Sequence, residues 1–115
     1  MTTISNNKFS DNLSLEDIRK MMFKFTNERN WHKFHTPRNL LMALVGEVGE
    51  LSEIFQWKGE VKPGLEEWND KEKEHLGEEI SDVLLYLVRL ADVCKIDLSK
   101  AVVDKMKKNN QKHKN

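Results

Sequence analysis

Two pairs of acidic residues fall on the apolar faces of predicted helices, where they could hold a divalent cation. Glu47 and Glu50 are three residues apart, as are Glu79 and Asp82, and residues at this spacing are neighbours on a helix surface. On a helical wheel, Glu47 projects into the apolar arc, Glu50 lies at its edge, and Glu79 and Asp82 lie along the rim of the second arc. An ionised carboxylate in apolar surroundings is unfavourable by several kcal/mol unless a cation accompanies it.

These acids leave two interpretations open. Acid pairs at this spacing are common on solvated helix faces, and one such pair is usually structural. Two inward-tilting pairs on separate helices are rarer, and together they offer the oxygen ligands that Mg²⁺ takes. Gly46 and Gly49 could admit close approach of another helix or a ligand, although tolerated helix glycines are the simpler explanation.

Aromatic and imidazole side chains are the next candidates. The rings of Trp31, Trp57 and Tyr86 could stack on a nucleobase, although each alone is more often a core residue. Trp68 is interpreted as packing. His35, beside a predicted helix start, is either a cap-region residue or a phosphate contact. His32 and His75 are interpreted as surface residues. Glu50 is the candidate general base, since it lies at the edge of the arc, and Glu53, which points further outward, is the alternative.

Four helices must position these residues, because apolar residues mostly recur at three- and four-residue spacing and strand-forming runs are few. The first is predicted from Ser14, which forms a capping box with Asp17. The second has Thr36 as N-cap and Pro37 at its first position, and runs to about Gln56. A glycine- and proline-containing loop, residues 58–69, precedes a third helix from Asn69 or Asp70 to about Cys94. Asp97 or Ser99 caps the fourth.

Length and charge restrict the function classes. The 115 residues suit one domain, which we divide into a disordered lead (1–13), the folded domain (14–110) and a polar tail (111–115). Lys and Arg total 19, as do Asp and Glu, and this balance argues against binding of a nucleic-acid polymer but not of a nucleotide. One cysteine and no apolar run of about 20 residues favour a cytoplasmic protein with no membrane association, and a nuclear pool is also compatible. The long apolar helices predict a homo-oligomer.

The acid pairs stand in segments that resemble a known family. The segments EVGELSE (47–53) and EEISDVLLYL (78–87) resemble the E-x-x-E and E-x-x-D motifs of the MazG-like all-α pyrophosphatases. A second likeness, to the branch that hydrolyses dCTP, is carried by LEDIRK, FTNERNWHKFHTPRNLLMALVGEVGELSEIFQWKGE and SDVLLYLVRLADVCKIDLSKAVVDKM. The resemblance covers nearly everything from Leu15 to Asn109.

The resemblance implies an all-α four-helix bundle of the MazG-like type, assembled as a homotetramer with active sites between subunits. It implies hydrolysis of dCTP and related 5-substituted pyrimidine dNTPs to monophosphate and pyrophosphate, which would clean the nucleotide pool. It implies Mg²⁺, with Mn²⁺ as a substitute, bound by Glu47, Glu50, Glu79 and Asp82, with Glu47 and Glu50 catalytic. The implied substrate-binding residues are Met22, Trp31, His32, Lys33, Phe34, His35, Trp57, Tyr86, Lys105 and Asn109.

One departure and two rivals qualify this prediction. Met22 stands where the family has a histidine that contacts substrate, and a methionine side chain cannot donate that hydrogen bond. A di-iron centre needs two Glu-x-x-His pairs, and the sequence has one, Glu72 and His75. The alternative to an enzyme is a non-catalytic helical oligomer that binds a nucleotide or a protein.

Overall fold

The computed structural model describes residues 7–10 and 12–113, and within these ranges the chain forms helices and no strand. The helices are α1 (Leu15–Glu28), the short η1 (His32–Phe34), α2 (Pro37–Gln56), α3 (Asp70–Val93) and α4 (Leu98–Lys112). The all-α prediction is therefore confirmed. Parts of the predicted lead (residues 1–6 and 11) and of the polar tail (residues 114–115) lie outside the described residues.

The helix starts follow the predicted caps. Ser14 and Asp17 form the capping box of α1, and the Thr36 side chain accepts a hydrogen bond from the Asn39 backbone N–H at the start of α2. Asn69 caps α3. Of the two candidates for α4, Asp97 is the residue whose side chain accepts the Lys100 N–H.

The aromatic- and imidazole-rich stretch NERNWHKFHT (27–36) predicts a loop that begins at Asn27, and the structure differs slightly from this prediction at the end of α1. The helix continues to Glu28, and Asn30 then takes a left-handed conformation with φ of 56°. The Trp31 N–H donates to the Thr26 carbonyl and the Asn30 N–H to the Asn27 carbonyl, which is the Schellman arrangement that ends many helices. This termination turns the chain into η1, so residues 31–35 are held close to the end of α1.

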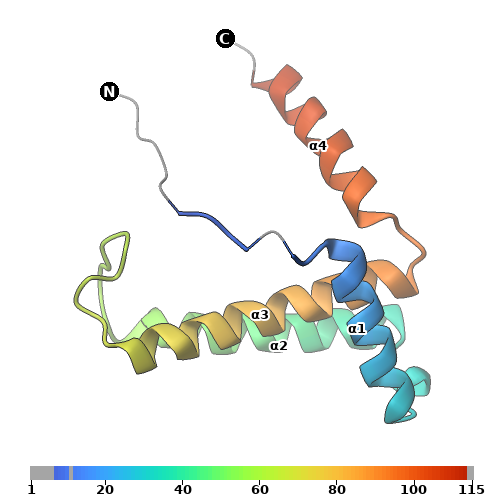
Figure 1. Cartoon of the computed structure of the whole chain (residues 1–115), viewed down its shortest axis with the longest axis horizontal. Coiled ribbons are helices and arrows are strands. Elements are labelled where there is room, and N and C mark those ends of the chain that lie inside the picture. The colour runs from blue at the N-terminus through green and yellow to red at the C-terminus, as the bar shows by residue number, and fades with distance from the viewer. Residues whose placement is uncertain (1–6, 11, 114–115) are drawn as a thin grey trace.

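The centre of the molecule is a hairpin of α2 and α3, which lie side by side and are joined at one end by the loop of residues 57–69 (Figure 1). Helix α1 packs across α3 near the carboxyl end of α3 (Figure 1). The buried hydrophobic residues of the helices are Ile18, Leu40 and Val88, and Trp68 of the connecting loop is buried against Phe55. Helix α4 projects away from the hairpin (Figure 1), and none of its described side chains is buried.

One chain leaves an unusually large surface exposed. The accessible surface is 9906 Å², whereas a compact monomer of 13.5 kDa would expose roughly 6,500 Å². The radius of gyration is 17.0 Å, against about 13 Å for a compact domain of this length. Much of the extra surface is apolar, because residues such as Val45, Ile80 and Met106 are about half exposed. Within the described residues, no helix has both the length and the hydropathy needed to cross a bilayer.

Candidate metal and nucleotide site

Three carboxylates from two helices meet between α2 and α3. Glu47 and Glu50 lie on α2 and Glu79 lies on α3. One oxygen from each residue lies within 4.8 Å of the others. This juxtaposition follows from the i, i+3 spacing on α2 and from the side-by-side packing of the two helices, which brings the apolar arcs together.

The polar environment of this carboxylate cluster fits a cation. One oxygen of Glu47 (Oε2) and one of Glu79 (Oε2) are buried and have no hydrogen-bond partner among the described residues. Burial raises the pKa of Glu47, and the neighbouring charges of Glu50, Asp82 and Glu79 raise that pKa further. Buried acceptors without donors are unfavourable, and carboxylate oxygens are the ligands that hard divalent cations prefer. The donor set therefore suits a magnesium-like ion.

Asp82 lies three residues after Glu79 on α3, about one turn further along. It is not among the three residues whose oxygens converge within 4.8 Å. Its charge nevertheless raises the pKa of Glu47, and both residues line the same cavity. The structure thus brings the fourth predicted ligand to the side of the cluster that faces α1.

On that side lies a cavity of about 470 Å³, here called the α1–α3 cavity. Its wall is mainly apolar and aromatic, with Glu47 and Asp82 as its acidic residues. It is lined by Met21, Met22, Phe25, Trp31, Glu47, Asp82, Leu85 and Tyr86. Three of the predicted substrate-binding residues, Met22, Trp31 and Tyr86, are therefore brought together beside two of the predicted metal ligands.

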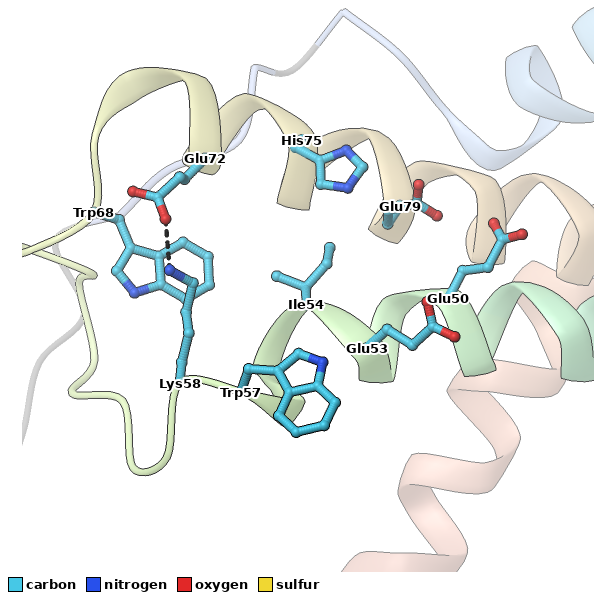
Figure 2. Close-up of a pocket in the computed structure, with 9 residues that line it drawn as sticks. All are labelled: Glu50, Glu53, Ile54, Trp57, Lys58, Trp68, Glu72, His75 and Glu79. Atoms are coloured by element: carbon cyan, nitrogen blue, oxygen red, sulfur yellow. Dashed lines mark hydrogen bonds and ion pairs between the residues drawn. The ribbon is translucent and has the colours of Figure 1, made fainter.

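On the other side of the cluster lies a second cavity of about 530 Å³, here called the hairpin-end cavity (Figure 2). Glu50 and Glu79 line it, together with Trp57, which is 84% exposed. Lys58 forms an ion pair with Glu72 across this cavity (Figure 2). In one chain, Trp57 therefore lies on the opposite side of the carboxylates from Trp31 and Tyr86.

Trp68 also borders the hairpin-end cavity but behaves as a packing residue. It is buried, its ring lies 5.4 Å from the Phe55 ring, and the Lys58 ammonium lies 4.7 Å from its ring centroid. His75, interpreted from the sequence as a surface residue, is exposed and lines the same cavity. These contacts agree with the packing interpretation of Trp68 and give His75 a position near Glu79 (Figure 2).

The segment from Trp31 to His35 divides into two kinds of residue. Lys33 and Phe34 are exposed and the Lys33 ammonium lies over the Phe34 ring. The δ nitrogens of His32 and His35 both contact the guanidinium of Arg89. Among the five residues of this segment, Trp31 is the one that lines the α1–α3 cavity.

Arg89 was not predicted as part of the site, although a signal was available. It follows Asp82 by seven residues, which is two helical turns, so the two side chains lie on the same face of α3. It is also three residues before Asp92, the spacing of an intrahelical ion pair, and that pair is present at 3.1 Å.

The two predicted residues on α4 stand apart from both cavities. Lys105 is exposed and Asn109 is half-buried, and neither lines the α1–α3 cavity or the hairpin-end cavity. Because α4 projects from the hairpin (Figure 1), a single chain does not bring them to the carboxylates.

Comparison with known proteins gives concordant results. Residues 35–115 match the family described as the MazG nucleotide pyrophosphohydrolase domain. The chain is 55% identical over 105 residues to dCTP pyrophosphatase 1 of Rattus norvegicus, covering 91% of this chain and 62% of that protein. Its identity to dCTP pyrophosphatase 1 of Homo sapiens is 53% over 105 residues, with the same coverage of 91% and 62%. The chain thus spans 62% of the length of these curated relatives.

A solved structure is similar across almost the whole fold. The crystal structure of a pyrophosphatase from Archaeoglobus fulgidus matches with a TM-score of 0.74 and 38% sequence identity, covering 94% of this chain and 100% of that one.

Proposed function

This chain belongs to the MazG nucleotide pyrophosphohydrolase family, and from that premise we propose that it hydrolyses dCTP and related 5-substituted pyrimidine dNTPs. The products are the nucleoside monophosphate and pyrophosphate, and the role is to clean the nucleotide pool. The relatives named dCTP pyrophosphatase 1 support this choice of substrate.

The observation that carries the proposal is the carboxylate cluster. Its members come from two facing helices, and two of its oxygens are buried without a donor among the described residues. A protein fold retains such unfavourable groups when a ligand compensates them. The adjoining cavities provide room for a nucleotide on either side.

We assign Glu47, Glu50, Glu79 and Asp82 as ligands of Mg²⁺, for which Mn²⁺ can substitute. When bound by these residues, the metal would neutralise charge on the triphosphate and lower the pKa of the attacking water. Glu50 is the exposed member of the converging cluster. It is therefore the carboxylate best placed to take the proton of that water. Glu47, at the inner side, supplies negative charge that holds the cation.

The base of the nucleotide occupies the α1–α3 cavity. The rings of Trp31 and Tyr86 offer surfaces for stacking, and Met22 completes the wall. Stacking contacts tolerate any base, so polar groups must supply the preference for a pyrimidine. We also propose that the segment after Trp31 borders the bound nucleotide. This segment consists of His32, Lys33, Phe34 and His35.

The remaining assigned residues need a second subunit. In one chain, the cavity that Trp31 and Tyr86 line does not include Trp57, Lys105 or Asn109. The molecule also exposes far more surface than a compact monomer, including many large apolar side chains. We propose a homo-oligomer, a tetramer built as a dimer of dimers, in which another subunit brings these residues to the cavity. We propose a cytoplasmic location for it, which microscopy of a tagged chain would test.

A panel of nucleotides tests the activity directly. The purified chain is incubated with dCTP, 5-methyl-dCTP, dUTP and dATP, with Mg²⁺ or with a chelator, and monophosphate and pyrophosphate are quantified. We expect equal amounts of both products from dCTP and its 5-substituted form, only with the metal. Release of orthophosphate, or no turnover of any nucleotide, would overturn the assignment and favour a binding module.

A further inference from the structure

Arg89 is a buried cation for which the proposed chemistry has no use. Its side chain is 5% exposed and its ion-pair partner on the same helix is Asp92, at 3.1 Å. Asp92 is shared with Arg19 of α1, whose guanidinium lies 3.4 Å from the other carboxylate oxygen. A buried guanidinium is retained when its donors are satisfied, so the rest of its contacts indicate what it holds.

The remaining hydrogen-bond contacts of Arg89 go to two histidines of one short segment, and its guanidinium also lies 5.9 Å from the centroid of the Phe23 ring. The Arg89 Nε donates to Nδ1 of His35 at 3.0 Å, and its Nη2 lies 3.1 Å from Nδ1 of His32. A guanidinium only donates hydrogen bonds, so both Nδ1 atoms must accept and both imidazoles must be neutral with the proton on Nε2. The Nε2 of His32 lies 3.2 Å from Oδ1 of Asn27, which accepts a hydrogen bond from this Nε2–H. The hydrogen bonds therefore run consistently from α3 through His32 to the end of α1.

The segment held in this way contains Trp31, a wall of the α1–α3 cavity. Trp31 directly precedes His32, and its ring lies 6.4 Å from the His35 ring. On α3, Tyr86 is three residues before Arg89, so the wall residue and the anchor are neighbours on the helix surface. Displacement of the two histidines would move Trp31 relative to Tyr86.

We infer that Arg89 is a positioning residue that anchors neutral His32 and His35 and thereby holds Trp31 against the nucleotide cavity. This inference deepens the proposed function and rests on it for its consequence in catalysis. The anchoring itself is a property of the free protein, so it can be measured without substrate.

The first experiment uses Arg89→Lys and the matched control Arg19→Lys. Both keep a positive charge and both alter a contact to Asp92, but only Arg89 reaches the histidines. In substrate-free protein at about pH 8, where histidine is neutral, nitrogen NMR of wild type should show both imidazoles as the Nε2–H form. Arg89→Lys should give mixed tautomers and a shifted Trp31 indole signal, whereas Arg19→Lys should leave these signals in place.

The second experiment tests whether His35 acts through its Nδ1 hydrogen-bond acceptor or through the bulk of its ring. In His35→Asn the amide oxygen can take the place of Nδ1, whereas His35→Leu has no acceptor. We expect Arg89→Lys and His35→Leu to raise KM for dCTP roughly tenfold with a smaller change in kcat, because the loss is in substrate positioning. His35→Asn should recover part of that loss, and Arg19→Lys should keep the wild-type KM.

The outcomes are distinguishable. Unchanged imidazole and Trp31 signals in Arg89→Lys would overturn the anchoring, as would equal KM values for His35→Asn and His35→Leu. If Arg89→Lys does not fold, the His35 pair decides by the His32 imidazole and Trp31 indole signals, which His35→Leu should change more than His35→Asn. If the NMR changes occur but wild type hydrolyses no nucleotide, the anchoring stands and the proposed function fails.

Discussion

At the scale of single residues, the four acids differ in surroundings but share one expected behaviour. Glu47→Gln, Glu50→Gln, Glu79→Gln and Asp82→Asn each remove an anionic ligand from a cation that must offset phosphate charge. We expect each to lower kcat/KM by roughly a hundredfold or more. Pyrophosphate release at saturating Mg²⁺ measures the effect. Glu78→Gln is the matched control, because Glu78 adjoins Glu79 but is exposed. Near-normal turnover of all four acid variants would contradict the assignment of these residues as metal ligands.

Glu47→Gln should lower activity, but in the metal-free protein it should also raise stability. Burial and then the charges of Glu50, Asp82 and Glu79 raise its pKa above 4.5, so the native state binds the proton more tightly than the unfolded state. The contribution of the Glu47 carboxyl to the free energy of unfolding is therefore fully present below pH 4.5, and it is lost as the pH rises through the native-state pKa. Glu47→Gln should therefore stabilise the metal-free fold at neutral pH, by of the order of 1 kcal/mol. Urea unfolding with chelator at pH 7 and pH 4 measures this, and a gain equal at both pH values would contradict it.

Substitutions at Met22 and Trp57 test which residues determine the base preference of the enzyme. Met22 lines the α1–α3 cavity beside Trp31, whereas Trp57 lies at the hairpin end. Met22→His adds a hydrogen-bonding group, and a site with such a group discriminates between analogues strongly. It should change the order of kcat/KM for dCTP, 5-methyl-dCTP and dUTP by roughly tenfold or more. Trp57→Ala should weaken all three by similar factors, and the reverse pattern would refute this division.

At the scale of the elements, α4 depends on its cap more than the other helices do. None of its described side chains is buried, so tertiary packing within one chain contributes little to its stability. The Asp97 side chain accepts the Lys100 N–H at 3.1 Å, and Asp97→Ala should cost about 1 kcal/mol. Hydrogen exchange of residues 98–112 should become several-fold faster, while Ser99→Ala, which removes no cap, should change it little. Equal effects of the two variants would mean that the cap does not stabilise α4.

At the scale of the whole molecule, the exposed apolar surface predicts obligate assembly. The surface of 9906 Å² exceeds by about half the roughly 6,500 Å² of a compact monomer, and the excess is larger than an isolated chain usually tolerates. Sedimentation should show an oligomer at micromolar concentration, with a tetramer as the expected species. Val45→Lys, at a residue that is 59% exposed in the single chain, should shift the distribution to smaller species and reduce activity. A stable, active wild-type monomer would exclude this assembly.

The local features of this protein follow from residues that are close together in the chain. Helix starts at Ser14, Thr36 and Asn69 were predictable because a cap acts through residues only three positions away. The inward tilt of Glu47 and Glu79 was predictable because helical periodicity sets which face a residue occupies. The buried, unpartnered oxygens of both residues agree with that reasoning.

How these local features combine depends on the packing of the helices against one another. The wheel placed Glu79 and Asp82 on one rim, but helix packing put Glu79 in the converging cluster and left Asp82 on the side facing α1. Helix packing also places Trp57 and Trp31 at different cavities. It brings Arg89 into contact with His32 and His35, which are more than fifty residues away along the chain. Sequence spacing carries no information on such long-range pairs, because they depend on the crossing of α1, α2 and α3 rather than on the period of any one helix.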